Sequence, residues 1–199
     1  MQLFYALLSP YARKCRVIIL EKGLSDKVEL VEVATADNDP RLLAVNPLGT
    51  IPALATDAGL HLCESPIICE YLDSLPSSAP ALFPQGDARL CALSLAALAD
   101  GIADAAVHCV LDSRRPADKQ FAPWVERKTG AILRALAKVE AAKLKSDVAL
   151  DIGNIALICA WDYTVFRLPQ LDLRNKFPEI ATWADIVSAR PSLVATKPV

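Results

Sequence analysis

Sequence patterns typical of β-strands are confined to the first third of this 199-residue chain. Short apolar or β-branched runs alternate there with helical patterns, at residues 2–7, 28–33, 51–55 and 60–62. Beyond residue 76 only helical periodicity is found, in Ala- and Leu-rich segments at 87–111, 121–144, 152–166 and 177–190. This β-α-β-α-β-β-α order followed by helices predicts a small α/β domain and then an all-helical domain.

A proline-rich segment separates the two halves. Pro76, Pro80, Pro84 and Gly86 lie within a few residues of one another, which is typical of a linker. We therefore predict a first domain at residues 1–76, a linker at 77–86 and a helical domain at 87–199. No internal repeat and no low-complexity tract interrupts this organisation.

The composition excludes several classes of protein. Apolar residues make up 53% and charged residues 22% of the chain, with a net charge of −2, which excludes wholesale disorder and a basic nucleic-acid-binding surface. No apolar run approaches the roughly 20 residues of a membrane span, and the start lacks the basic leader of a signal peptide. Six cysteines without a Cys-x-x-Cys pair and only two histidines favour reduced thiols and no metal site. We expect a cytoplasmic protein with neither a membrane nor a nucleic-acid partner.

Two Ser-Pro pairs, Ser9-Pro10 and Ser65-Pro66, predict helix starts in the first domain. In each pair the serine would be the N-cap and the proline the first helical residue. A single pair of this kind is usually structural. Two helix N-termini at one edge of a sheet would also present free N–H groups and positive dipole ends to two anionic groups of one ligand.

Pro52 lies within a predicted strand, where proline is tolerated only at an edge, at a strand start or at a bulge. If the Ile51–Pro52 bond is cis, Ile51 turns its backbone N–H and C=O outward, and an extended peptide can pair with them. The commoner alternative is an ordinary trans proline at the start of the strand.

Together these segments resemble the glutathione S-transferase family, and in particular its bacterial members. The matching pieces are residues 9–14, 46–54 and 64–72, and the resemblance covers nearly the whole chain. It implies a thioredoxin-like N-terminal domain, an all-helical C-terminal domain and a homodimer with a role in detoxification. In that dimer we expect the third helix, which contains Ser65, Ile68, Cys69 and Leu72, to contribute to the interface.

The resemblance also implies a role for each site residue. Ser9 would donate a hydrogen bond to the glutathione sulfur, and Ile51, before a cis Pro52, would pair with the cysteinyl part. Glu64 and Ser65 would bind the γ-glutamyl end. Thr50 stands where many relatives have a glutathione-binding lysine, and the residues expected around the second substrate are Tyr11, Asp104 and His108.

The implied chemistry is transfer of the glutathionyl group to a small hydrophobic alkyl or aryl electrophile, with glutathione as co-substrate. A thiol with a pKa of about 8.5 is only about 3% ionised at pH 7, and lowering that pKa by two units takes about 2.7 kcal/mol. A hydrogen bond to a charged group supplies about 1.5–3 kcal/mol, and a helix end adds about 0.3–1 kcal/mol. The Ser9 hydroxyl and its helix therefore suffice without a histidine base.

Two alternatives remain open at this point. One is a non-catalytic binding or regulatory protein, like the stringent starvation proteins, although such members tend to lose the site residues retained here as Glu64 and Ser65. The other is a glutathione-dependent peroxidase or reductase, which needs only the same thiolate. Arg114-Arg115-Pro116 ends the first long helix, and we interpret the two cations as a helix stop rather than as an anion site.

Overall fold

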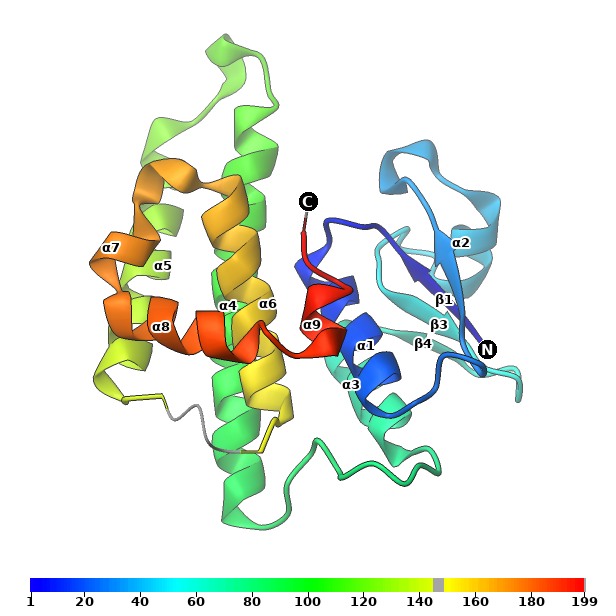
Figure 1. The fold of residues 1–199 in the computed structure, drawn as a ribbon. Coiled ribbons are helices and arrows are strands. Elements are labelled where there is room, and N and C mark those ends of the chain that lie inside the picture. Colours follow the sequence, from blue (N-terminus) through cyan, green and yellow to red (C-terminus); the bar gives the residue numbers. More distant parts are fainter. Residues whose placement is uncertain (145–148, 199) are drawn as a thin grey trace.

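The computed structural model describes residues 1–144 and 149–198 of the chain. A four-stranded sheet in the order β2-β1-β3-β4 organises the first half (Figure 1). Its strands are β1 (Gln2–Tyr5), β2 (Glu29–Glu32), β3 (Ala53–Ala55) and β4 (His61–Cys63). The helix between β1 and β2 makes that pair parallel, and the tight turn after β3 makes β3 and β4 antiparallel.

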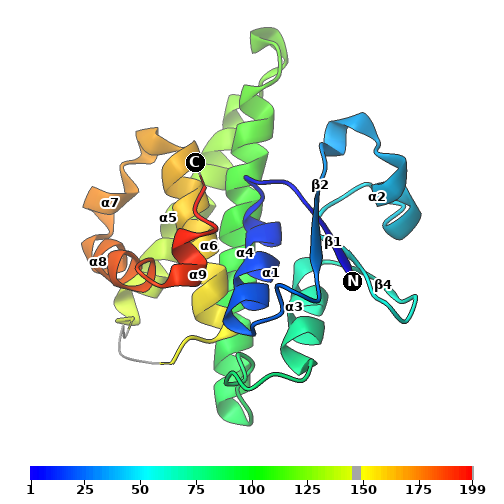
Figure 2. The same ribbon diagram turned by 45° about the vertical axis from the view of Figure 1, so that its right-hand side comes forward.

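Helices cover both faces of this sheet. α1 (Pro10–Glu21) and α3 (Ser65–Ser74) pack on one face, and the short α2 (Pro40–Val45) lies on the other (Figure 2). Alternation along the paired strands explains the two layers. Leu3 and Leu54 are partners that point into the larger core, whereas Phe4 and Ala53 point toward α2. The predicted β-α-β-α-β-β-α order is confirmed.

The second half is entirely helical in the described residues. Its helices are α4 (Asp87–Ser113), α5 (Ala122–Ala141), α6 (Ile152–Arg167), α7 (Leu173–Lys176), α8 (Pro178–Val187) and α9 (Pro191–Val194). Single 3₁₀ turns occur at Thr35–Asp37, Ala117–Lys119 and Pro169–Leu171. α4 and α6 pack most extensively, and Gly153 at the start of α6 permits their close approach, because a Cβ there would meet the Ala92 carbonyl oxygen at 2.7 Å.

α4 corrects the expectation that no segment is long and apolar enough to cross a membrane. By length and composition its 27 residues meet that description. In this fold the helix packs against α5 and α6 (Figure 1). Its buried side chains, among them Ala99, Ile102 and Ala106, belong to the main apolar core.

α1 fastens the helical half to the sheet through two buried cations. Arg13 donates to Asp162 of α6 at 2.8 Å, and Lys14 donates to Asp100 of α4 at 2.5 Å. Both cationic side chains are almost completely buried, so each requires a partner of opposite charge. These contacts fix the position of α4 and α6 relative to the N-terminus of α1.

The inward face of α3 packs against α1 inside the first domain. Ile68, Cys69 and Leu72 are fully buried against α1, and the Cys69 sulfur lies 3.7 Å from that of Cys15. Ser65 is buried as well. α3 therefore uses these four residues to pack inside its own domain, and the expectation that this helix contributes to a subunit interface remains a prediction for its outer face.

Candidate active site

Strand pairing brings three sequence motifs to the same end of the sheet. Phe4 pairs with Ala53 in the β1–β3 ladder, and Ala53 pairs with Cys63 in the β3–β4 ladder. The segment after β1, the segment before β3 and the segment after β4 therefore lie side by side. Those segments carry Ser9, Ile51-Pro52 and Glu64-Ser65, and α1 and α3 begin at this end of the sheet.

Ser9 is the N-cap of α1, as predicted, and Pro10 is the first helical residue. The Ala12 backbone N–H donates to Ser9 Oγ at 3.2 Å. Because the oxygen acts as the acceptor in this cap, the hydroxyl proton remains available to a second partner. Ser9 is half-buried and lines a cavity at the junction of the two halves.

The Ile51–Pro52 peptide bond is cis, and Ile51 lines the same cavity as Ser9. The turn before it is held by Asn46, a buried residue to which the sequence assigned no role. The Asn46 side-chain amide donates to the carbonyl oxygen and the hydroxyl of Thr50, at 2.8 and 2.9 Å. Its Oδ1 accepts from the Leu48 N–H at 3.1 Å. Asn46 thereby fixes the conformation of the chain that leads to Ile51.

The second helix start differs from the prediction by one residue. Glu64, not Ser65, is the N-cap of α3, and Pro66 is the second helical residue. The Glu64 carbonyl accepts from the Ile68 N–H, and the Glu64 backbone adopts a left-handed φ of 69°. Ser65 thus lies in the first turn, where its N–H has no acceptor within the helix. Its hydroxyl also makes no hydrogen bond within the described residues.

The cavity beside Ser9 has a volume of about 370 Å³ and mostly apolar walls. The sheet side contributes Ser9, Tyr11, Thr50 and Ile51. The helical half contributes Val107, Val110, Leu111 and Arg114 from the end of α4, and Tyr163 from α6. The cavity therefore has room for a small apolar molecule next to the Ser9 hydroxyl.

Tyr11, Asp104 and His108 have three different placements. Tyr11 lines the cavity, and its hydroxyl donates to Asp104 at 2.5 Å. Burial and the Asp104 carboxylate both raise the pKa of Tyr11, so the phenol stays protonated at neutral pH. Asp104 thus orients Tyr11 without lining the cavity itself. His108 does not line it either, because its exposed ring packs edge-on against Trp124 at the start of α5.

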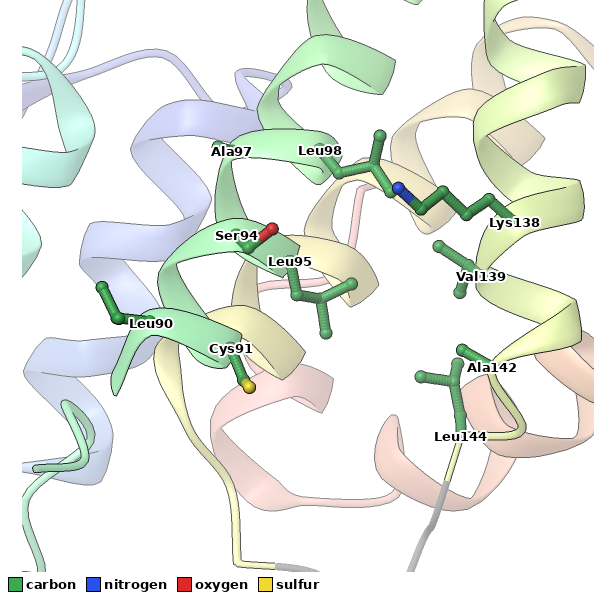
Figure 3. Close-up of a pocket in the computed structure, with 10 residues that line it drawn as sticks. All are labelled: Leu90, Cys91, Ser94, Leu95, Ala97, Leu98, Lys138, Val139, Ala142 and Leu144. Carbon is green, nitrogen blue, oxygen red and sulfur yellow. The ribbon is translucent and has the colours of Figure 1, made fainter. Parts of the chain in front are cut away.

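A larger apolar groove lies elsewhere, between α4 and α5 (Figure 3). Its volume is about 790 Å³, and it is lined by leucines and small residues together with Cys91, Ser94 and Lys138. None of the residues predicted to bind glutathione lies in it. Within residues 1–144 and 149–198, no three His, Cys, Asp or Glu side chains are grouped as metal ligands. We therefore take the smaller cavity beside Ser9 as the candidate active site.

Comparison with known proteins decides the family. The family model of the glutathione S-transferase N-terminal domain matches residues 8–75. Over 203 aligned residues the chain is 32% identical to the GST-like protein YibF of Escherichia coli strain K12, covering 100% of this chain and 98% of that protein. The chain belongs to the glutathione S-transferase family. The sheet with its helices is thus a thioredoxin-like domain, followed by the family's helical domain, as the fold prediction stated.

Two further relatives bear on function. A crystal structure of a glutathione transferase family member from Pseudomonas fluorescens Pf-5, with bound glutathione, superposes with a TM-score of 0.94 at 39% identity. That match covers 100% of this chain and 98% of the other. A stringent starvation protein A homologue from Histophilus somni is 40% identical over 73 residues, which is 37% of this chain and 33% of that protein.

Proposed function

We propose that this protein is a glutathione S-transferase that ionises the glutathione thiol for attack on a small hydrophobic electrophile. The observation that carries the proposal is the geometry of Ser9. Its oxygen is occupied by the Ala12 N–H, so its proton is free to point into a cavity at the N-terminus of α1. The structural relative at 39% identity, which holds glutathione, supports this choice of co-substrate.

The end of the sheet supplies complementary groups for the tripeptide. The Ser65 N–H and hydroxyl, in the first turn of α3, would bind the γ-glutamyl carboxylate. The Glu64 carboxylate would hold the ammonium group. Ile51 would pair its backbone with the cysteinyl residue, which directs the sulfur toward Ser9. Thr50 adds no positive charge, so binding depends on these neutral donors and on Glu64.

The reaction then requires little further chemistry. The Ser9 O–H donates to the sulfur, and the positive end of the α1 dipole favours the thiolate over the thiol. The thiol proton passes to water. A sulfur lone pair forms the new C–S bond, and the leaving group departs with the electron pair of its bond to carbon. The electrophile would pack on Tyr11 and the apolar end of α4.

Conjugation of 1-chloro-2,4-dinitrobenzene tests this proposal. We expect Ser9→Ala to lower kcat/KM by about 10- to 100-fold, because one hydrogen bond to a developing charge is lost. Ser74→Ala is the matched control, since the Ser74 hydroxyl donates to Tyr71 at the far end of α3 and should leave the rate unchanged. Equal glutathione-dependent rates in Ser9→Ala and wild type would remove Ser9 from the mechanism.

A regulatory binding protein is the second candidate, and the match to a stringent starvation protein A homologue favours it. That match covers only about a third of each chain, and Ser9, Glu64 and Ser65 at one end of the sheet support the transferase instead. Calorimetry with glutathione separates the two candidates. Binding at micromolar to millimolar concentration supports the transferase, and the absence of heat at millimolar glutathione supports the regulator.

Turnover of cumene hydroperoxide in parallel would assign peroxidase activity to the same thiolate.

We also propose a homodimer, with the groove between α4 and α5 as its centre (Figure 3). Leu90 on the rim of the groove is 68% exposed, and Ile67 on the outer face of α3 is 53% exposed. Solvent contact of these side chains is unfavourable, and a second copy would remove it. Sedimentation should give a dimer for wild type and for the control Ile186→Glu, and a monomer for Leu90→Glu. A wild-type monomer at micromolar concentration would contradict this proposal.

A further inference from the structure

The two arginines at the end of α4 have different surroundings. Arg114 is the C-cap of the helix, in agreement with the predicted stop, and the residue also lines the candidate active-site cavity. The next residue, Arg115, does not line the cavity and lies 3.9 Å from the Asp112 carboxylate. No carboxylate in the described ranges lies within ion-pair distance of Arg114. A positive charge therefore borders the cavity at this end of α4.

Tyr163 of α6 contributes a second donor to the same cavity. The residue is buried, and its hydroxyl makes no hydrogen bond to any group in the parts of the chain that the structure describes. Burial raises the pKa of the Tyr163 phenol, although Arg167 and Arg114 lie near enough to oppose that rise. The hydroxyl is therefore protonated at neutral pH and can donate to an anion that also contacts Arg114.

Charged residues along α4 make the two ends of the cavity electrostatically different. Asp104 and Arg114 are ten residues apart, which is about 15 Å along a helix axis. The Asp104 carboxylate already accepts from Tyr11, whereas Arg114 at the end of α4 has no carboxylate partner among the described residues. Between them Val107, Val110 and Leu111 form an apolar wall at helical spacing. A ligand with an apolar body and an anionic end, oriented toward Arg114, matches this layout.

We propose that the electrophile carries a carboxylate, which Arg114 binds through its guanidinium and Tyr163 through its hydroxyl. The inference rests on the proposed transferase function and adds the substrate class. A planar carboxylate suits a guanidinium, which offers two parallel N–H donors. The body of the electrophile lies against Val107 and Leu111, with its reactive carbon toward the sulfur held at Ser9.

Binding of two matched conjugates tests the proposal without requiring turnover. The probes are S-(4-carboxybenzyl)glutathione and S-(4-carbamoylbenzyl)glutathione, which have nearly the same shape and differ in charge. By calorimetry, wild type should bind the carboxylate conjugate about fivefold more tightly, as expected for a partly exposed ion pair assisted by one hydroxyl. Arg114→Gln should abolish this preference, and Tyr163→Phe should reduce it. Arg115→Gln, which keeps the cavity intact, should retain it.

The following outcomes would refute the carboxylate subsite, either alone or together with the transferase function. Equal binding of the two conjugates by wild type, or a preference that survives Arg114→Gln, refutes the carboxylate subsite and leaves the transferase function standing. Failure of wild type to bind glutathione and both conjugates refutes the two together. Loss of the preference in Arg115→Gln as well as in Arg114→Gln assigns it to general surface charge and also refutes the subsite.

Discussion

Glu64 combines backbone strain with a proposed binding role at this site. Its φ of 69° lies in the region that favours glycine, and a non-glycine residue held there costs about 1–3 kcal/mol. The conformation turns the chain from β4 into α3 and places Ser65 in the first helical turn. Strain of this kind persists where the surrounding structure enforces it, here next to the proposed γ-glutamyl site.

Two substitutions separate the strain from the charge. Glu64→Gly should raise the free energy of unfolding by about 1 kcal/mol, because glycine adopts positive φ without steric cost. Glu64→Ala keeps the strain and should leave that free energy nearly unchanged. Both variants should weaken glutathione binding in calorimetry, since both lose the carboxylate. Destabilisation by Glu64→Gly in urea titrations, or undiminished binding by Glu64→Ala, would contradict this reading.

Local rules predicted some residues of the site and missed others. Ser9 was predictable because an N-cap serine and a following proline act within one turn. The same rule predicted the second N-cap at Ser65, one residue after the observed N-cap at Glu64. The rule missed Glu64 because the positive φ of this residue belongs to the β4–α3 connection and is not a preference of glutamate. Whether His108 and Arg114 line the cavity depends on which side of α4 faces the sheet. Alanines and leucines occur on several sides of α4, so its periodicity did not reveal this.

At the scale of elements, helix prediction succeeded because the signals are local. The helix expected at 87–111 is α4, and those expected at 121–144, 152–166 and 177–190 are α5, α6 and α8. The short helices α7 and α9 were missed, since four residues carry too little periodicity. The sequence also did not reveal how closely α4 and α6 pack, because their distance depends on the absence of a side chain at Gly153, where the two helices cross.

The crossing of α4 and α6 gives a stability prediction with an internal control. Gly153→Ala should lower the free energy of unfolding by about 1–3 kcal/mol, because the new Cβ would overlap the Ala92 carbonyl oxygen and press on Leu95. Gly101→Ala in α4 has open space around its Cβ and should raise the same quantity by about 0.5–1 kcal/mol through helix propensity. Urea unfolding measures both. A neutral Gly153→Ala would show that the two helices can separate without cost.

At the scale of the whole molecule, α1 is the element on which both halves depend. Its N-terminus carries Ser9, its middle holds Asp162 and Asp100 through Arg13 and Lys14, and its last residue is Glu21. Glu21 accepts from Arg190 at 2.9 Å and from Ser192 at 2.5 Å, which fastens the start of α9 to the C-terminus of α1. The candidate site therefore lies at the junction whose geometry these contacts maintain.

The Glu21 contact predicts a dependence of stability on pH. Burial alone would raise the pKa of Glu21, but hydrogen bonds from Arg190 and Ser192 hold it below its ordinary value of 4.5. The unfolded chain thus takes up the proton first, and the stabilisation is complete above pH 4.5 and is lost as pH falls through the lower, folded value. Glu21→Gln should be less stable than wild type at pH 7, and the difference should shrink below pH 4.5.

Unfolding free energies between pH 3 and 7 measure this effect, with Glu126→Gln on the exposed face of α5 as the control for loss of one surface charge. A stability difference between Glu21→Gln and wild type that stays constant across this range would show that the carboxylate is not what joins α1 to α9.

Titration of the thiol of bound glutathione, followed by the ultraviolet absorbance of the thiolate, measures directly how far the site ionises the sulfur. We expect the pKa of the bound thiol to lie near 6.5, about two units below that of an ordinary thiol in buffer, and we expect Ser9→Ala to return most of the difference. A bound thiol that ionises at the same pH as free glutathione would contradict this expectation.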